Sequence, residues 1–181
     1  MKRSERRKGG GRAPAESDRR GIVILDATVP LNFARIDRLD LLGQVPVPLR
    51  VGRIVATDEL RHWPWASARA GEPFDLVAEL GTSITVTQMD SDEELAMFAR
   101  CREVLHLGRG ECECVAIASA RSWTVATDDG HARRILARHD VRVELTGTLG
   151  LLQVLVDAGL VTQADVTRIV EKMKSGGARL P

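Results

Sequence analysis

Hydrophobic residues along the chain fall into short runs of strand length and longer runs with helical spacing. Residues 22–25 are continuously apolar, as expected for a strand that is buried on both faces. Residues 91–105 have the spacing of an amphipathic helix, and Ser91 with Glu94 forms a capping box at its start. The two kinds of run alternate, which predicts an α/β fold with a parallel sheet.

The whole chain divides into such elements. The expected strands are residues 22–25, 45–51, 83–89, 123–127 and 141–145. The expected helices are residues 29–42, 53–63, 67–80, 91–105, 110–121, 130–139, 148–158 and 162–173. Pro46 and Pro48 limit the second strand to a sheet edge or a strand start, because proline has no N–H to donate. These elements predict a three-layer α/β/α sandwich around a central, mostly parallel sheet.

Composition indicates one globular domain. The chain has 181 residues, of which 44% are hydrophobic, so it is long enough to bury a core. Residues 1–20 carry eight Lys or Arg against three Asp or Glu and are poor in apolar residues. We expect them to form a disordered basic leader, either a solvated extension or an arm that holds RNA phosphates. Residues 21–175 are expected to form the domain, and residues 176–181 a C-terminal tail.

Composition also excludes several classes of protein. Aromatic residues make up 3% of the chain, which argues against a base-stacking surface. No apolar stretch approaches the roughly 20 residues that span a bilayer, and the N-terminus lacks the apolar core of a signal peptide, so a cytoplasmic location is expected. Cys101, Cys112 and Cys114 are expected to be buried thiols, because their spacing does not fit the usual zinc pattern.

Acidic residues stand at the ends of apolar runs that are far apart in sequence. Asp26 follows residues 22–25, and the pair Asp128-Asp129 follows residues 123–127. Ligands of open parallel sheets bind outside the carboxyl ends of the strands. Carboxylates that meet there repel one another and their pKa values rise, a conflict that a divalent cation removes. The pattern predicts a carboxylate–metal site and hence a phosphodiester hydrolase.

Two further acids are candidates for the same site, and each has a structural alternative. Glu59 lies in the helix 53–63, where an isolated acid is usually solvated. Glu111 lies in the first turn of the helix expected over 110–121, where the helix dipole alone stabilises an acid by roughly 0.3–1 kcal/mol. Asp26 has an alternative role as a helix cap. Glu113 is about 200° around the helix from Glu111, so we expect it to face solvent.

Polar neighbours could support these acids. Thr28 either bonds a carboxylate oxygen or caps the following helix, and Asn32 is placed to hold a metal-bound water. One of Asp128 and Asp129 should lie beside Asp26, and the sequence alone does not decide which. Arg133 and Arg134 are interpreted as helix-surface cations, with contact to a substrate phosphate as the alternative.

Taken in order, the motifs resemble the PIN-domain ribonuclease family. They are the strand–Asp–x–Thr at 26–28, the acid–Leu at 59–60, the G-x-G-E at 108–111 and the T-D-D at 127–129. The stretch 146–161, T-G-T-L-G-L-L-x-V-L-V-D-A-G-L-V, is similar to a toxin-like prokaryotic PIN subgroup. The resemblance covers roughly residues 21–170.

The resemblance implies an endonuclease that cuts RNA and depends on Mg²⁺ or Mn²⁺, and a toxin paired with an antitoxin protein. A homodimer is expected. The acidic positions of the family correspond to Asp26, Glu59, Glu111, Asp128 and Asp129, of which Asp26, Glu111 and Asp128 are the expected metal ligands, with Thr28 and Asn32 supporting them. The family often spaces its last acids as T-x-D, which would select Asp129.

Two alternatives remain beside the nuclease. One is a PIN-like module that binds RNA or protein without turnover. The other is a haloacid-dehalogenase-like phosphatase, which requires a second Asp two residues after the first, where this chain has Thr28. Trp63 and Trp65 are expected to be core or dimer contacts, and the alternative is an RNA-stacking pair.

Overall fold

Five parallel strands form a single sheet in the computed structural model, which describes residues 21–181. The strands are β1 (Val23–Leu25), β2 (Leu49–Gly52), β3 (Ile84–Thr87), β4 (Thr124–Ala126) and β5 (Glu144–Thr146). Their order in the sheet is β3-β2-β1-β4-β5, and every neighbouring pair is parallel. Because β1 is central and all strands point the same way, Leu25 pairs with Val51 on one side and Ala126 on the other. The residues that follow these strands therefore meet at one edge.

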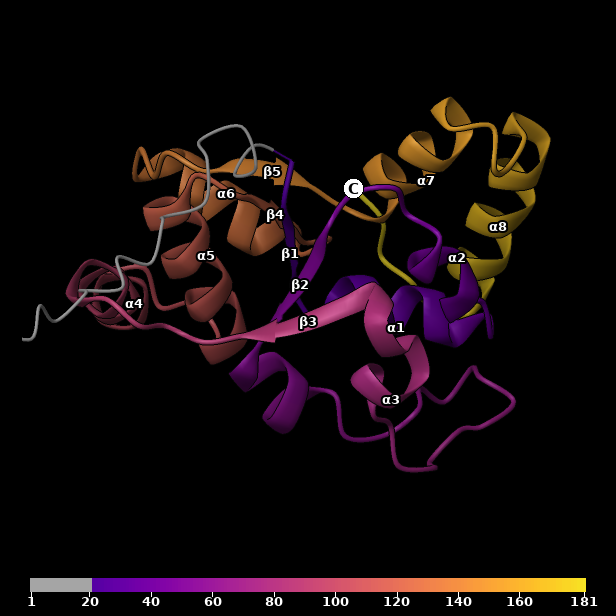
Figure 1. Ribbon diagram of the computed structural model, residues 1–181, viewed down its shortest axis with the longest axis horizontal. Helices are drawn as coiled ribbons and strands as arrows, with labels where there is room; N and C mark the ends of the chain where they lie inside the picture. The colour runs from indigo at the N-terminus through magenta and orange to yellow at the C-terminus, as the bar shows by residue number, and fades with distance from the viewer. Residues whose placement is uncertain (1–20) are drawn as a thin grey trace, which may run out of the picture.

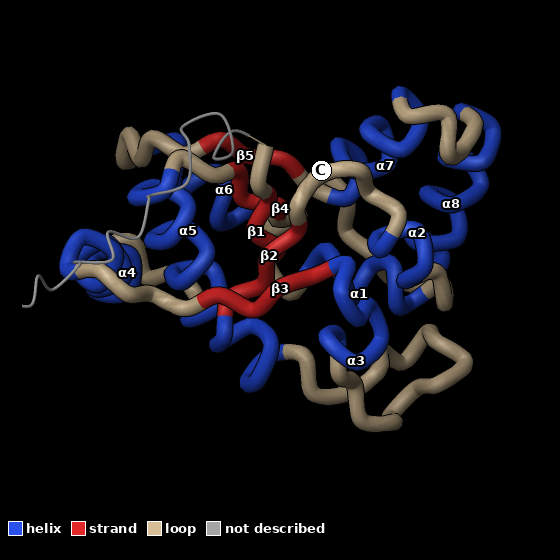
Figure 2. The backbone as a smooth tube through the Cα atoms, viewed as in Figure 1, coloured by secondary structure: helices blue, strands red, loops and turns tan. Residues whose placement is uncertain are grey.

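Helices cover both faces of the sheet, which confirms the predicted three-layer α/β/α sandwich (Figure 1, Figure 2). One side carries α4 (Asp92–Glu103), α5 (Arg109–Arg121) and α6 (Gly130–Arg138). The other side carries α1 (Thr28–Arg35), α2 (Leu39–Gly43), α3 (Leu76–Leu80), α7 (Thr148–Asp157) and α8 (Gln163–Ser175). The capping box predicted at Ser91 and Glu94 is present at the start of α4.

The core has two parts. The larger part surrounds the sheet, where Ile24 and Leu25 are fully buried. The smaller part lies between α4, α5 and α6 and includes Cys101 and Cys112, while Cys114 belongs to the larger part. All three thiols are buried and free, which confirms the prediction for them.

Three expected helices are shorter than their sequence pattern. The helix predicted over 29–42 is split into α1 and α2, because Asp37 adopts a left-handed backbone with φ of 55°. The helix predicted over 53–63 contracts to a π-helical turn, η2 (Val55–Glu59). The helix predicted over 67–80 survives only as α3, since Gly71 takes a φ of 83° and the helix starts after its cap at Asp75.

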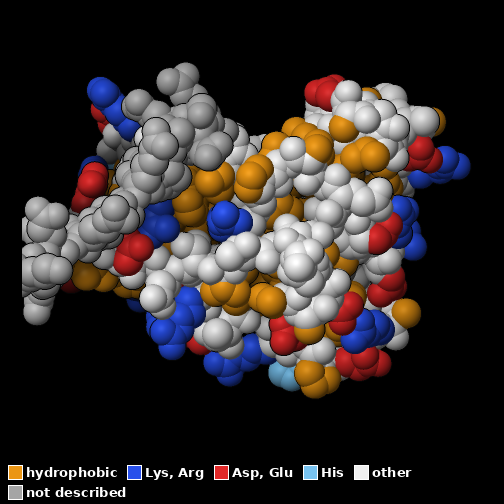
Figure 3. Space-filling view, viewed as in Figure 1, with side chains coloured by type: hydrophobic (Ala, Val, Ile, Leu, Met, Phe, Trp, Pro, Cys, Tyr) orange, Lys and Arg blue, Asp and Glu red, His pale blue; other side chains and the backbone are white. Residues whose placement is uncertain are grey.

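The second strand starts just after Pro48 and lies inside the sheet, so the strand-start alternative is correct and the edge alternative is wrong. Both prolines precede the ladder and remove no hydrogen bond from it. On the face shown in Figure 3, hydrophobic side chains gather over the middle, and acidic and basic ones alternate along the side of α7 and α8. Within residues 21–181, no helix combines the length and the apolar character that crossing a membrane requires. The predicted leader, residues 1–20, lies outside the described residues.

Candidate functional site

Asp26 lies at the carboxyl end of β1 and is 3% exposed. Its Oδ2 accepts hydrogen bonds from the hydroxyls of Thr28 at 2.7 Å and Thr127 at 3.0 Å. Burial raises the pKa of Asp26, and the two hydroxyls oppose that rise. The helix that follows is capped at Ala27 without a side-chain hydrogen bond, so capping does not explain this carboxylate.

Asp129 is held next to Asp26 by a shared hydroxyl. Thr127 Oγ1, which donates to Asp26, also accepts the backbone N–H of Asp129 at 3.1 Å. Asp129 Oδ1 accepts the N–H groups of His131 at 2.6 Å and Ala132 at 2.9 Å, and so caps the start of α6. One oxygen of Asp129 is thus used for capping.

Glu59 and Glu111 meet at the start of α5. The backbone N–H of Gly110 donates to Glu59 Oε1 at 2.9 Å. The next residue, Glu111, bends back so that its Oε2 accepts the N–H of Gly108 at 2.8 Å. A side chain at position 110 would overlap the Glu59 carboxylate, so glycine permits this close approach.

The four carboxylates of Asp26, Glu59, Glu111 and Asp129 influence one another electrostatically. Burial raises the pKa of Glu111 to about 7, and the charges of Asp26, Asp129 and Glu59 add to the rise. Burial also raises the pKa of Glu59, with Asp26 contributing. Within residues 21–181, none of the four forms a salt bridge with a Lys, Arg or His. The charge of Arg109 lowers the pKa of Glu59, but burial and the neighbouring carboxylates outweigh it, so the pKa stays raised.

The four carboxylates share one hydrogen-bonding pattern. In each, one oxygen accepts from a backbone N–H or a threonine hydroxyl. The second oxygen of each has no donor among the described residues. Each acid is thus oriented through one oxygen, and its other oxygen remains available for a ligand.

Asp128, by contrast, is directed away from this group. Its Oδ2 accepts from Asn32 Nδ2 at 2.7 Å and from the Thr148 hydroxyl, and its Oδ1 accepts the backbone N–H of Thr148 at 2.9 Å. Asn32 is engaged in the same way, because its Oδ1 also accepts from Arg35 Nη1 at 2.6 Å. The Asp128–Asn32–Thr148 group joins β4, α1 and α7.

The other predicted side chains divide between structural roles and exposed positions. Arg133 donates to the carbonyls of Thr127, at 3.0 and 2.8 Å, and of Thr146, so it ties the ends of β4 and β5 instead of standing free on the helix surface. Trp63 is buried and packs on Phe74 with ring centroids 4.8 Å apart, as a core residue. Trp65 is 72% exposed.

The prediction for Glu113 was wrong. This side chain is 2% exposed, and its Oε2 accepts the N–H of Ile54 at 2.7 Å, which joins α5 to the segment after β2. Residues 112–118 of α5 are all buried, so helical spacing could not identify a solvent face. Thr127 belongs to the T-D-D motif but has no role predicted from sequence, and neither has Thr148, although both follow strands at the edge where the acids lie.

The four carboxylates have the oxygen ligands that a hard cation prefers, but their side chains are too far apart to hold one in this arrangement. Carboxylate oxygens are the ligands that Mg²⁺ and Mn²⁺ prefer. Yet no three His, Cys, Asp or Glu side chains in residues 21–181 are grouped so that they could hold a metal ion. Binding a cation therefore requires the available oxygens to be drawn together by side-chain rotation.

The chain matches the model of a known protein family. The family model DUF3368, described as a PIN domain, matches residues 22–181. The searches of curated proteins and of solved structures returned no match. The matched region includes all four acids of the group and the segment after α8.

Proposed function

Because the chain belongs to the PIN-domain family, whose members are generally nucleases, we propose that it is a metal-dependent endoribonuclease. One observation carries the proposal. Asp26, Glu59, Glu111 and Asp129 come from four separate segments, lie at the edge where ligands of parallel sheets bind, and form no salt bridge among the described residues.

We assign the metal ligands to Asp26, Glu111 and Asp129, with Glu59 beside them. Asp129 replaces Asp128 in this assignment, because both oxygens of Asp128 already accept hydrogen bonds. A bound Mg²⁺ or Mn²⁺ would lower the pKa of its water and stabilise the charge that develops on phosphorus. Thr28 is retained as a supporting residue because it orients Asp26, whereas Asn32 supports Asp128.

The chain's own residues orient each acid through one oxygen and leave the other oxygen for a ligand. The hydroxyls of Thr28 and Thr127 hold Oδ2 of Asp26. The N–H groups of Gly108 and Gly110 do the same for Glu111 and Glu59. With its pKa at about 7, the Glu111 carboxyl group is close to half protonated at neutral pH, and a cation would displace that proton.

Substitution of Asp26 tests the proposal. Asp26→Asn should lower Mn²⁺-dependent cleavage of RNA by more than the roughly 10–100-fold that supporting residues of metal sites cost. The fold should persist, because burial already favours the neutral form at this position. Asp157→Asn, on the exposed surface of α7, is the matched control. Cleavage by Asp26→Asn at the rate of the unmodified protein would refute the nuclease.

A module that binds without turnover is the second candidate, favoured by the absence of a metal-spaced group of acids in residues 21–181. Calorimetric titration with Mn²⁺ separates the two. Saturable binding that Asp26→Asn removes supports the enzyme, and no binding supports the module.

The likeness of residues 146–161 to toxin-like PIN proteins supports a finer proposal. We propose that the protein acts in the cytoplasm as a homodimeric toxin of a type II toxin–antitoxin pair, restrained by an antitoxin protein. Expression of the chain alone should arrest the growth of a bacterial host, and expression of Asp26→Asn should not. Equal growth of both strains would contradict the toxin.

A further inference from the structure

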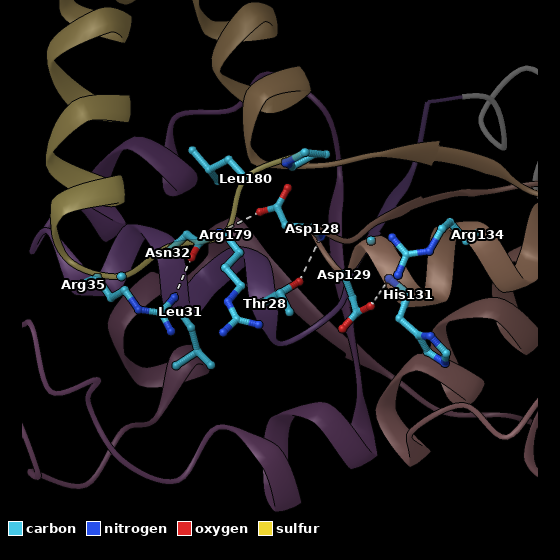
Figure 4. Close-up of a pocket in the computed structure, with 13 residues that line it drawn as sticks. Thr28, Leu31, Asn32, Arg35, Asp128, Asp129, His131, Arg134, Arg179 and Leu180 are labelled. Carbon is cyan, nitrogen blue, oxygen red and sulfur yellow. Dashed lines mark hydrogen bonds between the residues drawn. The ribbon is translucent and has the colours of Figure 1, made fainter.

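Next to the acids lies a cleft of about 520 Å³ that the proposed reaction leaves unexplained. Thr28, Asp128 and Asp129 form its wall at the strand ends. Arg35 on α1, Arg134 on α6 and Arg179 after α8 also line it. Figure 4 shows these three guanidinium groups approaching from different sides of the cleft. The cleft thus has an acidic region at the strand ends, formed by Asp128 and Asp129, and a basic region formed by the three arginines.

Arg179 comes from the segment expected to be a tail, and this segment is anchored. The chain turns after α8 at Gly177, whose φ is 87°. The N–H of Ala178 then donates to Met173 O at 2.9 Å, and Ala178 is 9% exposed. Gly177, Arg179, Leu180 and Pro181 all line the cleft. The segment therefore carries the Arg179 side chain to the rim in a defined place (Figure 4).

The arginines have donors that the described residues leave unused. Arg35 is oriented by its bond to Asn32, yet its Nε is buried without an acceptor in residues 21–181. Neither Arg134 nor Arg179 forms a salt bridge in the same residues. Three guanidinium charges around one cleft, two of them without a salt bridge among the described residues, favour an anionic ligand there.

Guanidinium groups match the geometry of phosphate oxygens and bind them through paired hydrogen bonds. A cleft of about 520 Å³ lies within the size range of small-ligand pockets, so it suits one nucleotide and not a duplex. Asp128 does not compete for the arginines, because both of its oxygens accept from Asn32 and Thr148. The acidic side of the cleft, with Asp129, lies toward the proposed cleavage site.

We propose that this cleft binds the phosphate of a single-stranded RNA nucleotide adjacent to the phosphodiester that is cut, and that Arg179 is one of its phosphate ligands. The inference rests on the proposed nuclease function for the position of the scissile bond. Arg134 and Arg35 complete the phosphate site, and the segment after α8 is part of the substrate-binding surface.

Binding and cleavage by the full chain test the two proposals separately. The probe is a short fluorescein-labelled oligouridylate, followed by anisotropy in EDTA over a series of NaCl concentrations. Arg179→Gln and Arg134→Gln change exposed side chains, and Arg168→Gln on α8, also exposed, is the matched control. Each cleft variant should weaken binding by about tenfold or more and reduce the salt slope by about 0.7, the value for one single-strand phosphate contact. In Mn²⁺, kcat/KM for RNA cleavage should fall by a similar factor in each cleft variant and stay unchanged in Arg168→Gln.

Several results would overturn the phosphate site. They are unchanged binding by Arg179→Gln, an equal loss in Arg168→Gln, and no binding by the unmodified protein. Tighter binding or faster cleavage by Arg179→Gln would show that the segment obstructs the cleft, and would overturn the proposal as well. If the cleft variants lose binding as expected but the unmodified protein never cuts RNA, the phosphate site stands and the nuclease fails.

Discussion

Gly110 donates its backbone N–H to Glu59 Oε1 at 2.9 Å and so joins η2 to the first turn of α5. A Cβ atom at position 110 would overlap the Glu59 carboxylate. We expect Gly110→Ala to displace Glu59 and lower RNA cleavage by about 10–100-fold. Stability should hold, because alanine favours a helix over glycine by up to about 1 kcal/mol. Cleavage rate and melting temperature, measured on the same sample, check both parts.

Gly43→Ala is the control for this substitution. Its added Cβ would meet Leu80 Cδ2 at 3.4 Å, in helix α2, which contributes none of the four acids. It should leave cleavage unchanged. An equal fall in cleavage for the two variants would mean that Glu59 does not depend on the space at Gly110.

Asp128 and Asp129 should respond differently to the same change. Asp128→Asn places an amide among the donors of Asn32 and Thr148, and should destabilise the fold by about 1–3 kcal/mol. Asp129→Asn keeps the cap on α6, because Asn and Asp cap helices about equally well, and should abolish cleavage with little loss of stability.

Urea unfolding and RNA cleavage of the two variants give the answer. Cleavage retained by folded Asp129→Asn and abolished in folded Asp128→Asn would return the ligand role to Asp128.

The pair also shows what a sequence can and cannot supply. Strand ends place both acids at the edge, but only the turn into α6 decides which side chain faces Glu111.

Much of the fold follows from local patterns. Three features have physical causes that act within a few residues. They are the short apolar runs that form buried strands, the capping box at Ser91 and the alternation of strands with helices. The three shortened helices differ for a tertiary or backbone reason. Asp37 and Gly71 adopt positive φ values that no periodicity reveals, and η2 ends at Glu59, whose carboxylate accepts a hydrogen bond from the start of α5.

The sequence indicates which acids are candidates and names Thr28 as a support, but it does not identify the other residues that orient the acids. Carboxylates that follow strands of a parallel sheet lie at one edge, so the sequence could place Asp26 and the pair Asp128-Asp129 together. Thr127 joins Asp26 and Asp129 through its hydroxyl, and nothing in its sequence position distinguishes it from any other threonine after a strand. Arg179 reaches the cleft only because Gly177 turns the chain after α8, a path that the sequence does not encode by periodicity.

Glu113 provides a test of the wrong prediction. Its carboxylate accepts the N–H of Ile54 at 2.7 Å, just before η2. Glu113→Ala removes this acceptor and should destabilise the protein by about 1–3 kcal/mol. Glu113→Gln keeps an amide oxygen for the same N–H and should cost less. Urea unfolding of both checks the difference, and an equal, negligible effect would place Glu113 outside the network that supports Glu59.

The raised pKa of Glu111 predicts a dependence of stability on pH. The ordinary value of 4.5 rises to about 7 in the folded protein, so the native state binds this proton more tightly than the unfolded state does. The resulting stabilisation is fully present below 4.5 and is lost as the pH rises through about 7. In EDTA, the free energy of unfolding should therefore fall over this range.

Glu111→Gln removes the titration and should flatten this slope. Solvent screens the partly exposed side chain and reduces the effect of the pKa shift on stability. The variant should therefore be more stable than the unmodified protein by about 1 kcal/mol at about pH 8, or roughly 2–4 °C in Tm. Glu103→Gln, exposed on α4, is the matched control and should keep the slope. Mn²⁺ at the higher pH should restore the stability of the unmodified protein by binding the charged form, and should not affect Glu111→Gln. An unchanged slope in Glu111→Gln would show that another carboxyl group carries the raised pKa.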